Sequence, residues 1–319
     1  MAAEHSPQTL LAAIRYYSDL DVCQDLLVEA RWPDGVTCPQ CGSKSVSYLE
    51  NQRRWQCREK HSRRQFSVKV GTIFEDSPIG LDKWFTAMWL IAGAKNGISS
   101  YEVHRAIGVT QKTAWFMLHR IRLAMQTKTF MKIDGEAEVD ETYIGGKARN
   151  MHKGRRERAG ISQHTSMAGK VAVMGLLERH GKDGHSVMRT EVISGRKRHQ
   201  LRQPIEKHIT QGATIHTDAF TAYKGLESDY VHNVIDHAEK YVDGNIHTNG
   251  CENFWSLLKR GLKGTYVSVE PFHLFRYLDE QVYRFNNRTD TDAGRFAGVL
   301  AAVTGRRVTY KMLIGGQSA

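Results

Sequence analysis

The chain has 319 residues, of which 40% are hydrophobic and 25% charged, so it is long enough for two or three domains with a sizeable core. No run approaches the roughly 18 apolar residues that a membrane span needs, and the N-terminus lacks the basic start and apolar stretch of a secretion signal. We therefore expect a cytoplasmic protein with no membrane partner. Lysine and arginine outnumber aspartate and glutamate by 45 to 34, and this net charge of +11 favours a polyanionic partner without establishing one.

The first predicted element is a helical leader over residues 1–34. Apolar residues recur at helical spacing between Thr9 and Leu27, and Cys23 lies in this apolar context, which indicates a buried thiol. Pro33 and Gly35 then mark a turn that separates the leader from the next segment.

Residues 35–75 carry four candidate metal ligands and are predicted to form a zinc ribbon. Two residues separate Cys38 from Cys41, fifteen more precede Cys57, and three separate Cys57 from His61. This spacing is typical of a zinc site in which two turns supply two ligands each. Because four protein ligands leave no open position, we expect a structural zinc. His61 is the weakest ligand, since it also fits a surface histidine beside an incomplete site.

Residues 80–128 are predicted to form a three-helix unit of the helix-turn-helix type. Ser99 or Ser100 caps a short helix, Gly108 makes a tight turn, and Thr110 caps the helix that follows. Modules of this kind insert the second helix of the motif into the major groove of DNA. An ordinary helical hairpin in a core is the alternative. If the module binds DNA, the side chains that reach the groove are those at the start of the last helix, Gln111, Lys112 and Thr113.

Three carboxylates between residues 132 and 290 are candidate ligands for two Mg²⁺ or Mn²⁺ ions. Asp140 lies in an alternating β-like run, Asp218 ends a second such run, and Glu252 opens a helix. Two strand acids and one helix acid can converge on a pair of cations that promote phosphodiester displacement. Lys259 follows Glu252 by seven residues, close to two helical turns, so both project from one face. This lysine is a candidate for holding a phosphate.

Each of these residues also has an ordinary structural interpretation. Asp140 suits a turn or a lysine partner, Asp218 suits a helix cap, and Glu252 suits the third position of a capping box. Lys259 suits a solvated surface, and Cys251 is by default a packing residue. The flanking residues therefore have to decide between the two interpretations.

A basic stretch over residues 147–170 has seven lysines and arginines against one acid and shows no clear period. We expect an exposed loop there. Both a solvated insertion and a loop that follows a DNA backbone fit this composition.

Several longer motifs resemble those of bacterial insertion-sequence transposases with an N-terminal zinc ribbon, the ISXO2-like family. The resemblance covers the chain from about residue 9 to Asn287 and rests on RWPDGVTCPQCG, QFSVKVGTIFE, GVTQKTAWFMLHRIR, VDETYIGGK and ENFWSLLKRGLKGTY. It implies an α+β multidomain fold with a zinc ribbon, a helix-turn-helix, and an RNase H-like α/β catalytic domain over 132–290, whose mixed sheet is flanked by helices. A basic tail follows over 291–319.

The resemblance also assigns roles to single residues. The family's two aspartates and its third acidic position match Asp140, Asp218 and Glu252, and the lysine of the last motif matches Lys259. The family often ends its ribbon with a fourth cysteine where this chain has His61, and this departure bears only on that ligand.

The activity implied is that of a transposase acting in a bacterial cytoplasm, and on the nucleoid when it acts. It would bind terminal inverted repeats in double-stranded DNA, cut at the element ends and join the 3′-hydroxyls to target DNA. Because two ends must be cut together, a homodimer or larger assembly on DNA is expected. One alternative is a zinc-ribbon, helix-turn-helix regulator with an inactive scaffold, which the intact acid trio opposes. The other is a ribonuclease H-type nuclease for RNA–DNA hybrids, which would not need roughly 130 residues of DNA-recognition apparatus.

Overall fold

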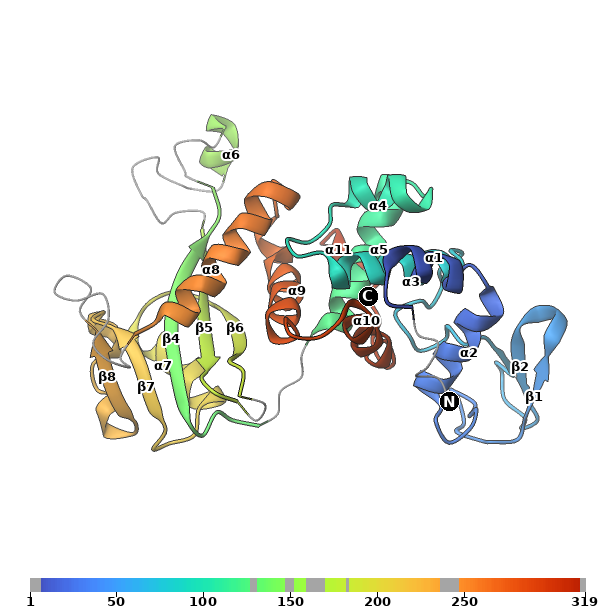
Figure 1. The fold of residues 1–319 in the computed structure, drawn as a ribbon, viewed down its shortest axis with the longest axis horizontal. Helices are drawn as coiled ribbons and strands as arrows, with labels where there is room; N and C mark the ends of the chain where they lie inside the picture. The colour runs from blue at the N-terminus through green and yellow to red at the C-terminus, as the bar shows by residue number, and fades with distance from the viewer. Residues whose placement is uncertain are drawn as a thin grey trace. The chain divides into compact units, whose positions relative to one another are not determined.

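The structure is a computed structural model that describes residues 7–126, 131–146, 152–158, 170–181, 184–235 and 247–315. The chain divides into two compact units (Figure 1). Unit 1 combines residues 1–126 with 287–319, and unit 2 is the intervening segment 127–286. None of the described helices is long and apolar enough to cross a membrane. Most of the basic stretch 147–170 lies outside the described residues, which include there only α6 (Lys153–Arg158) with His152, and Lys170.

Unit 1 begins with two helices and a small antiparallel sheet. The segment predicted as one helical leader forms two helices, because Asp19 caps the second through backbone N–H groups of its first turn. A three-stranded sheet follows in the order β1-β2-β3, with the 3-10 turn η1 (Glu50–Gln52) between its first two strands. The elements are α1 (Leu10–Tyr17), α2 (Leu20–Arg31), β1 (Val46–Leu49), β2 (Arg54–Cys57) and β3 (Gln65–Phe66).

Two of the three further helices of unit 1 have the caps that their sequence predicts. Ser99 caps the second helix in a capping box with Glu102, and Gly108 ends it in the left-handed conformation at φ 62°. Thr110 then caps the third helix through the amide of Thr113. The three-residue turn between these helices is therefore fixed by local chemistry. The helices are α3 (Leu81–Gly93), α4 (Ser100–Ile107) and α5 (Gln111–Met125).

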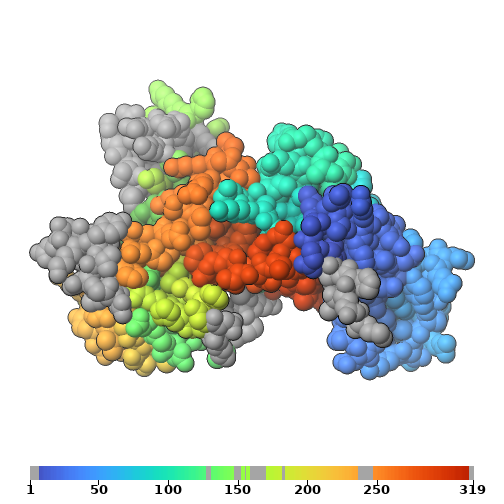
Figure 2. Space-filling model, viewed as in Figure 1, coloured from blue at the N-terminus to red at the C-terminus, as the bar shows by residue number. Residues whose placement is uncertain are grey.

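The C-terminal segment, for which the sequence predicts a basic tail, contains α10 (Asp292–Ala301) and α11 (Tyr310–Leu313) and belongs to unit 1. Phe296 stacks on Tyr17 with ring centroids 4.9 Å apart and meets Phe85 edge-on at 5.5 Å. In the space-filling view the red C-terminal and blue N-terminal residues accordingly lie against each other (Figure 2). The core of unit 1 is thus built from both ends of the chain.

Unit 2 is built on a five-stranded mixed sheet in the order β6-β5-β4-β7-β8. The strands β4, β5 and β6 pair antiparallel in chain order, whereas β7 and β8 run parallel to β4. This arrangement confirms the mixed sheet of the predicted RNase H-like fold. The strands are β4 (Glu136–Ile144), β5 (Val171–Glu178), β6 (Val187–Ile193), β7 (Thr214–Asp218) and β8 (Val231–Ile235).

Helices cover both faces of this sheet. On one face, Leu201 and Ile205 of α7 (Arg198–His208) pack with Val139 and Ile215 of the strands. On the other face, α8 (Asn249–Gly261) crosses β4 and β5, and α9 (Leu274–Asn286) packs on β6 (Figure 1). The remaining short turns are η3 (Thr221–Tyr223), η4 (Leu226–Ser228), the π-helical η5 (Leu262–Tyr266) and η6 (Pro271–His273).

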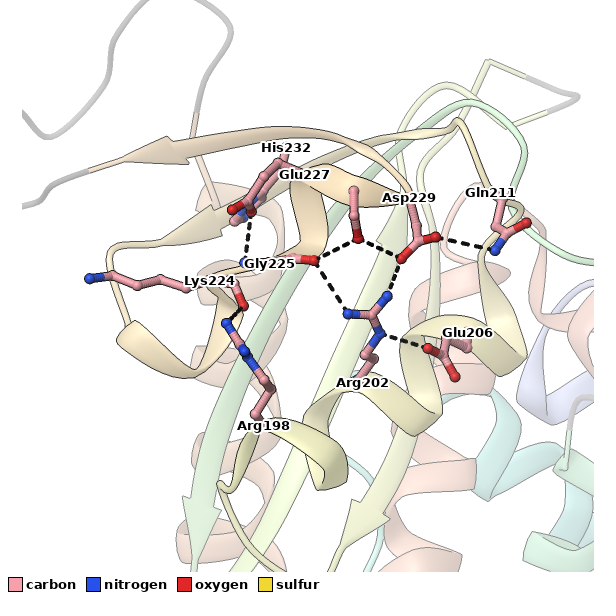
Figure 3. A network of polar contacts seen from close by, with 10 residues as sticks. Arg198, Arg202, Glu206, Gln211, Lys224, Gly225, Glu227, Asp229 and His232 are labelled. Atoms are coloured by element: carbon pink, nitrogen blue, oxygen red, sulfur yellow. Dashed lines mark hydrogen bonds and ion pairs between the residues drawn. The ribbon is translucent and has the colours of Figure 1, made fainter.

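A polar network ties α7 to the segment that follows β7 (Figure 3). Arg202 donates to Glu206 at 2.7 Å and also contacts Asp229 and the carbonyl of Gly225. Gln211 meets the second carboxylate oxygen of Asp229. The network braces the connection between the end of β7 and β8.

Candidate active site and metal centre

The four predicted ribbon ligands come together in the structure. The Sγ atoms and the ring nitrogen concerned all lie within 4.8 Å of one another, and they belong to Cys38, Cys41, Cys57 and His61. His61 Nε2 is 3.4 Å from Cys38 Sγ, and Cys41 Sγ is 3.6 Å from Cys57 Sγ. Three thiols and one imidazole at this spacing form the donor set of a structural zinc site. The position of His61 supports its assignment as the fourth ligand.

The local fold explains how such a short segment brings the four ligands together. Gly42 follows Cys41 at φ 73°, a conformation that glycine adopts without strain, so the first pair of ligands lies on a tight turn. Behind the site, Trp55 stacks on Phe66 at 6.1 Å and meets Trp32 edge-on at 5.7 Å. This apolar cluster is small, so the metal contributes to holding the ribbon together.

Asp140 and Asp218 lie at equivalent positions on neighbouring parallel strands. The last paired residues of β4 and β7 are Glu138 and His216, and each acid lies two residues further along its own strand. Ile215 belongs to the α7 face, so strand alternation places Asp218 on the α8 face. Asp140 is on that face too, since its Oδ2 accepts a hydrogen bond of 2.9 Å from the indole N–H of Trp255 in α8.

The carboxyl group of Asp140 carries a strongly perturbed pKa. Burial is the main reason that this pKa is raised to about 7, and the nearby carboxylates of Glu141 and Asp218 contribute to the rise. Hydrogen bonds from the Trp255 indole and from the backbone N–H of Glu141 oppose the rise. A desolvated acid beside other carboxylates favours a bound cation, because a cation stabilises the ionised form of each. The surroundings of Asp140 therefore fit a hard metal ion with oxygen ligands.

Glu252 is placed by two contacts of its helix with β4. The backbone N–H of the preceding residue, Cys251, donates to Glu138 Oε2 at 3.0 Å, and Trp255 one turn later donates to Asp140. Glu252 lies between these contacts and is half-buried. Lys259, two turns further along α8, is half-buried as well. Because seven residues of a helix make nearly two turns, Glu252 and Lys259 project from the same side of α8.

The three carboxylates are less tightly grouped than the ribbon ligands. Within the described part of the chain, only the ribbon cluster brings three or more ligand atoms within 4.8 Å of one another. A pair of metal ions about 4 Å apart spreads its ligands more widely than a single tetrahedral zinc does. The structure thus brings Asp140 and Asp218 together and docks the helix of Glu252 beside them, without closing the trio.

Three residues that shape this site were not predicted from the sequence. Trp255 binds Asp140, Glu138 binds the first turn of α8, and Gly175 lies opposite Asp140 in β5. A glycine inside a buried strand marks a close approach, and this signal was available in the run VAVMGLLE. No comparable signal distinguishes Trp255 from any aromatic residue on the core face of a helix.

The residues predicted to read DNA lie at the start of α5, and each has a partner within unit 1. Gln111 donates to the Ser100 hydroxyl at 2.8 Å, and the Thr113 hydroxyl pairs with that of the N-cap residue at 2.8 Å. The ammonium group of Lys112 lies 4.6 Å from the ring centroid of Tyr310. Of these three residues, Lys112 is exposed, whereas Gln111 and Thr113 are half-buried.

Comparison with known proteins finds matches for both the zinc ribbon and the sheet domain. The model of the ISXO2-like transposase domain matches residues 132–286, and that of a transposase zinc-ribbon domain matches residues 19–61. A protein of transposable element ISH50 from Halobacterium salinarum is 30% identical over 249 residues, which cover 75% of this chain and 81% of that protein. A transposase-like protein of Haemophilus influenzae is 31% identical over 84 residues, which are 26% of this chain and 68% of that protein. The chain therefore belongs to the ISXO2-like transposases, with a zinc ribbon ahead of the catalytic domain.

Proposed function

We propose that the protein binds the terminal inverted repeats of an insertion sequence and catalyses Mg²⁺-dependent cleavage and strand transfer into target DNA. The observation that carries the proposal is the placement of Asp140 and Asp218 side by side on parallel strands, on the face covered by α8. That helix carries Glu252, and its Trp255 is hydrogen-bonded to Asp140.

In this proposal Asp140, Asp218 and Glu252 hold two Mg²⁺ or Mn²⁺ ions through their carboxylate oxygens. When bound, such ions supply the Lewis acidity that activates a water or a 3′-hydroxyl and stabilises the leaving oxygen. The chain itself orients the ligands, because Trp255 fixes one oxygen of Asp140 and the Glu141 amide fixes the other. Lys259 presents a cation on the same helix face as Glu252 and would hold a phosphate at the cleaved end.

DNA recognition is assigned to unit 1. The capped turn around Gly108 presents the start of α5, and the exposed Lys112 is the side chain best placed to contact a phosphate or base edge. Gln111 and Thr113 would exchange their present partners for DNA. Because two element ends must be processed together, a homodimer or larger assembly is part of the proposal.

The test is a strand-transfer assay on duplex DNA that carries the element end, with and without Mg²⁺. We expect Asp218→Asn to reduce cleavage by at least about 100-fold, because changes to residues that merely support metal ligands already cost about 10–100-fold. Asp134→Asn is the matched control, since Asp134 is exposed and precedes β4. This control should retain activity within about twofold, the usual effect of an exposed substitution.

Each other outcome of this assay opposes the proposal in a different way. Full activity in Asp218→Asn would exclude the site assignment. DNA-end binding without Mg²⁺-dependent cleavage in the unmodified protein would identify a regulator with an inactive scaffold. Cleavage of RNA–DNA hybrids irrespective of sequence would identify a ribonuclease H-type nuclease.

A further inference from the structure

We propose that Glu138 is a positioning residue whose buried carboxylate holds the start of α8 against β4 and thereby sets the place of Glu252. Its side chain is only 2% exposed and lies on the same face of β4 as Asp140, two residues away. The catalytic consequence rests on the proposed function. The contact between strand and helix does not, and it is testable without any activity.

Both oxygens of Glu138 are used. Oε2 accepts from the backbone N–H of Cys251 at 3.0 Å, and Oε1 accepts from Arg179 Nε at 2.8 Å. Arg179, with a 7% exposed side chain, in turn donates to the carbonyl oxygen of His247 at 2.7 Å. The Glu138–Arg179 pair therefore holds both the first turn of α8 and His247, two residues before the helix begins.

The start of α8 depends on Glu138, a residue of strand β4. Its own N-cap residue, Thr248, makes no side-chain hydrogen bond to the first turn. Free N–H groups and the positive end of the helix dipole favour an acceptor with negative charge at this end. Glu138 supplies that charge, and Arg179 offsets the cost of burying it. The cap of α8 is thus provided by the sheet rather than by the helix's own sequence.

Gly250 shows how close the approach is. A Cβ atom at this position would lie 2.9 Å from Glu138 Oε2 and 3.0 Å from a methyl carbon of Leu177. A Cβ atom there would force the Glu138 carboxylate or the Leu177 side chain to shift, so glycine lets the helix reach the carboxylate in its present position.

Two contacts one turn apart therefore determine where Glu252 lies. The Cys251–Glu138 hydrogen bond holds the helix start, and the Trp255–Asp140 bond fixes the next turn. Glu252 lies between them. Since a displacement of about 1 Å at a reacting group costs up to about 100-fold in rate, loss of the first contact should reach the chemistry.

The test compares Glu138→Gln with Glu136→Gln in the full-length protein. The glutamine at 138 keeps the shape but offers one oxygen and an amide N–H₂, so either Arg179 or the helix N–H loses its acceptor. Glu136 provides the matched control, because it lies on the same strand, its side chain is 47% exposed, and it meets Arg179 only at 3.5 Å.

Two measurements are made on each variant. The first is the Mg²⁺ concentration that gives half-maximal cleavage, which we expect to rise about tenfold or more in Glu138→Gln, with activity partly regained at saturating Mg²⁺. The second is the rate of alkylation of Cys251, read by mass spectrometry against Cys23 in unit 1. Both thiols belong to residues that are 0% exposed. We expect Cys251 to react about tenfold faster or more in Glu138→Gln, in proportion to local opening, while Cys23 is unchanged.

The inference is overturned if Cys251 is alkylated at the same rate in Glu138→Gln as in Glu136→Gln. It is also overturned if Cys251 reacts faster in Glu138→Gln while that variant is active and needs the same Mg²⁺ concentration for half-maximal cleavage. If Glu138→Gln does not fold, Arg179→Lys replaces it, because lysine keeps the charge but cannot bridge Glu138 and His247 in the same way. The same two results then decide. A protein without any Mg²⁺-dependent cleavage would fail the proposed function, and Cys251 alkylation would still decide whether Glu138 holds the helix.

Discussion

The hydrogen bond between Trp255 and Asp140 depends on a residue in the neighbouring strand that has no side chain. Gly175 of β5 pairs directly with Asp140 of β4. A Cβ atom at this glycine would lie 2.6 Å from Cζ2 of the Trp255 indole. The indole therefore occupies space that a side chain at position 175 would fill, and from there its N–H group reaches the carboxylate 2.9 Å away.

We predict that Gly175→Ala displaces the indole and lowers the free energy of unfolding of unit 2 by about 1–3 kcal/mol, the usual cost of overpacking a filled core. Gly135→Ala is the matched control, since a Cβ there meets nothing within 4 Å, and its effect should stay within about 0.5 kcal/mol. Urea unfolding of both variants checks this. Equal urea midpoints for the two variants would show that the indole moves aside with no loss of stability.

Among the elements, the zinc ribbon and α8 illustrate two ways of stabilising a short segment. The ribbon strands have only two to four residues each, and the four ligands meet at one point of the ribbon. In contrast, α8 is held by its apolar face and by acceptors on the sheet. The ribbon should therefore respond to metal removal and α8 should not.

We predict that removing zinc with a chelator abolishes hydrogen-exchange protection in β1 to β3 and leaves that of β4 and β5 unchanged, because the ribbon has little core of its own. His61→Ala should weaken zinc binding by about tenfold or more, since it deletes one of four ligands. Protection that survives complete removal of zinc would mean that the apolar cluster around Trp55 suffices.

On the scale of the whole molecule, the two ends of the chain complete one unit while the segment between them forms the other. The backbone N–H of Ile73 donates to Val303 at 3.1 Å, and the N–H of Gly305 donates to Gly71 at 2.9 Å. Arg306 donates to carbonyl groups at the end of α5. Unit 1 is therefore complete only when residues beyond the catalytic domain have been synthesised.

We predict that Val308→Ala combined with Leu313→Ala lowers the stability of unit 1 by about 3 kcal/mol or more, because both side chains are at least 98% buried. Met312→Ala, at a residue 48% exposed on the same short helix, should change it by less than about 0.5 kcal/mol. Hydrogen exchange resolved by unit measures both effects. A loss confined to unit 2 would contradict this division of the chain.

Local geometry allowed the sequence to determine part of this protein by itself. The spacing of Cys38, Cys41, Cys57 and His61 predicted the cluster that the structure contains, because a metal site of this kind needs only two turns with paired ligands. The caps around Gly108 were also predicted, since a cap involves residues three or four positions apart. The family motifs identified Asp140, Asp218 and Glu252 as the candidate acids, and their roles as metal ligands stay predictions.

The tertiary structure alone decided how distant residues meet at the site. Trp255 and Asp140 are 115 positions apart, and Cys251 and Glu138 are 113 apart, so no local pattern links them. The same holds for Tyr310 against Lys112, which gives a predicted DNA-contacting side chain a partner inside unit 1. Such contacts depend on how the layers of a fold pack, which the spacing of residues along one element does not encode.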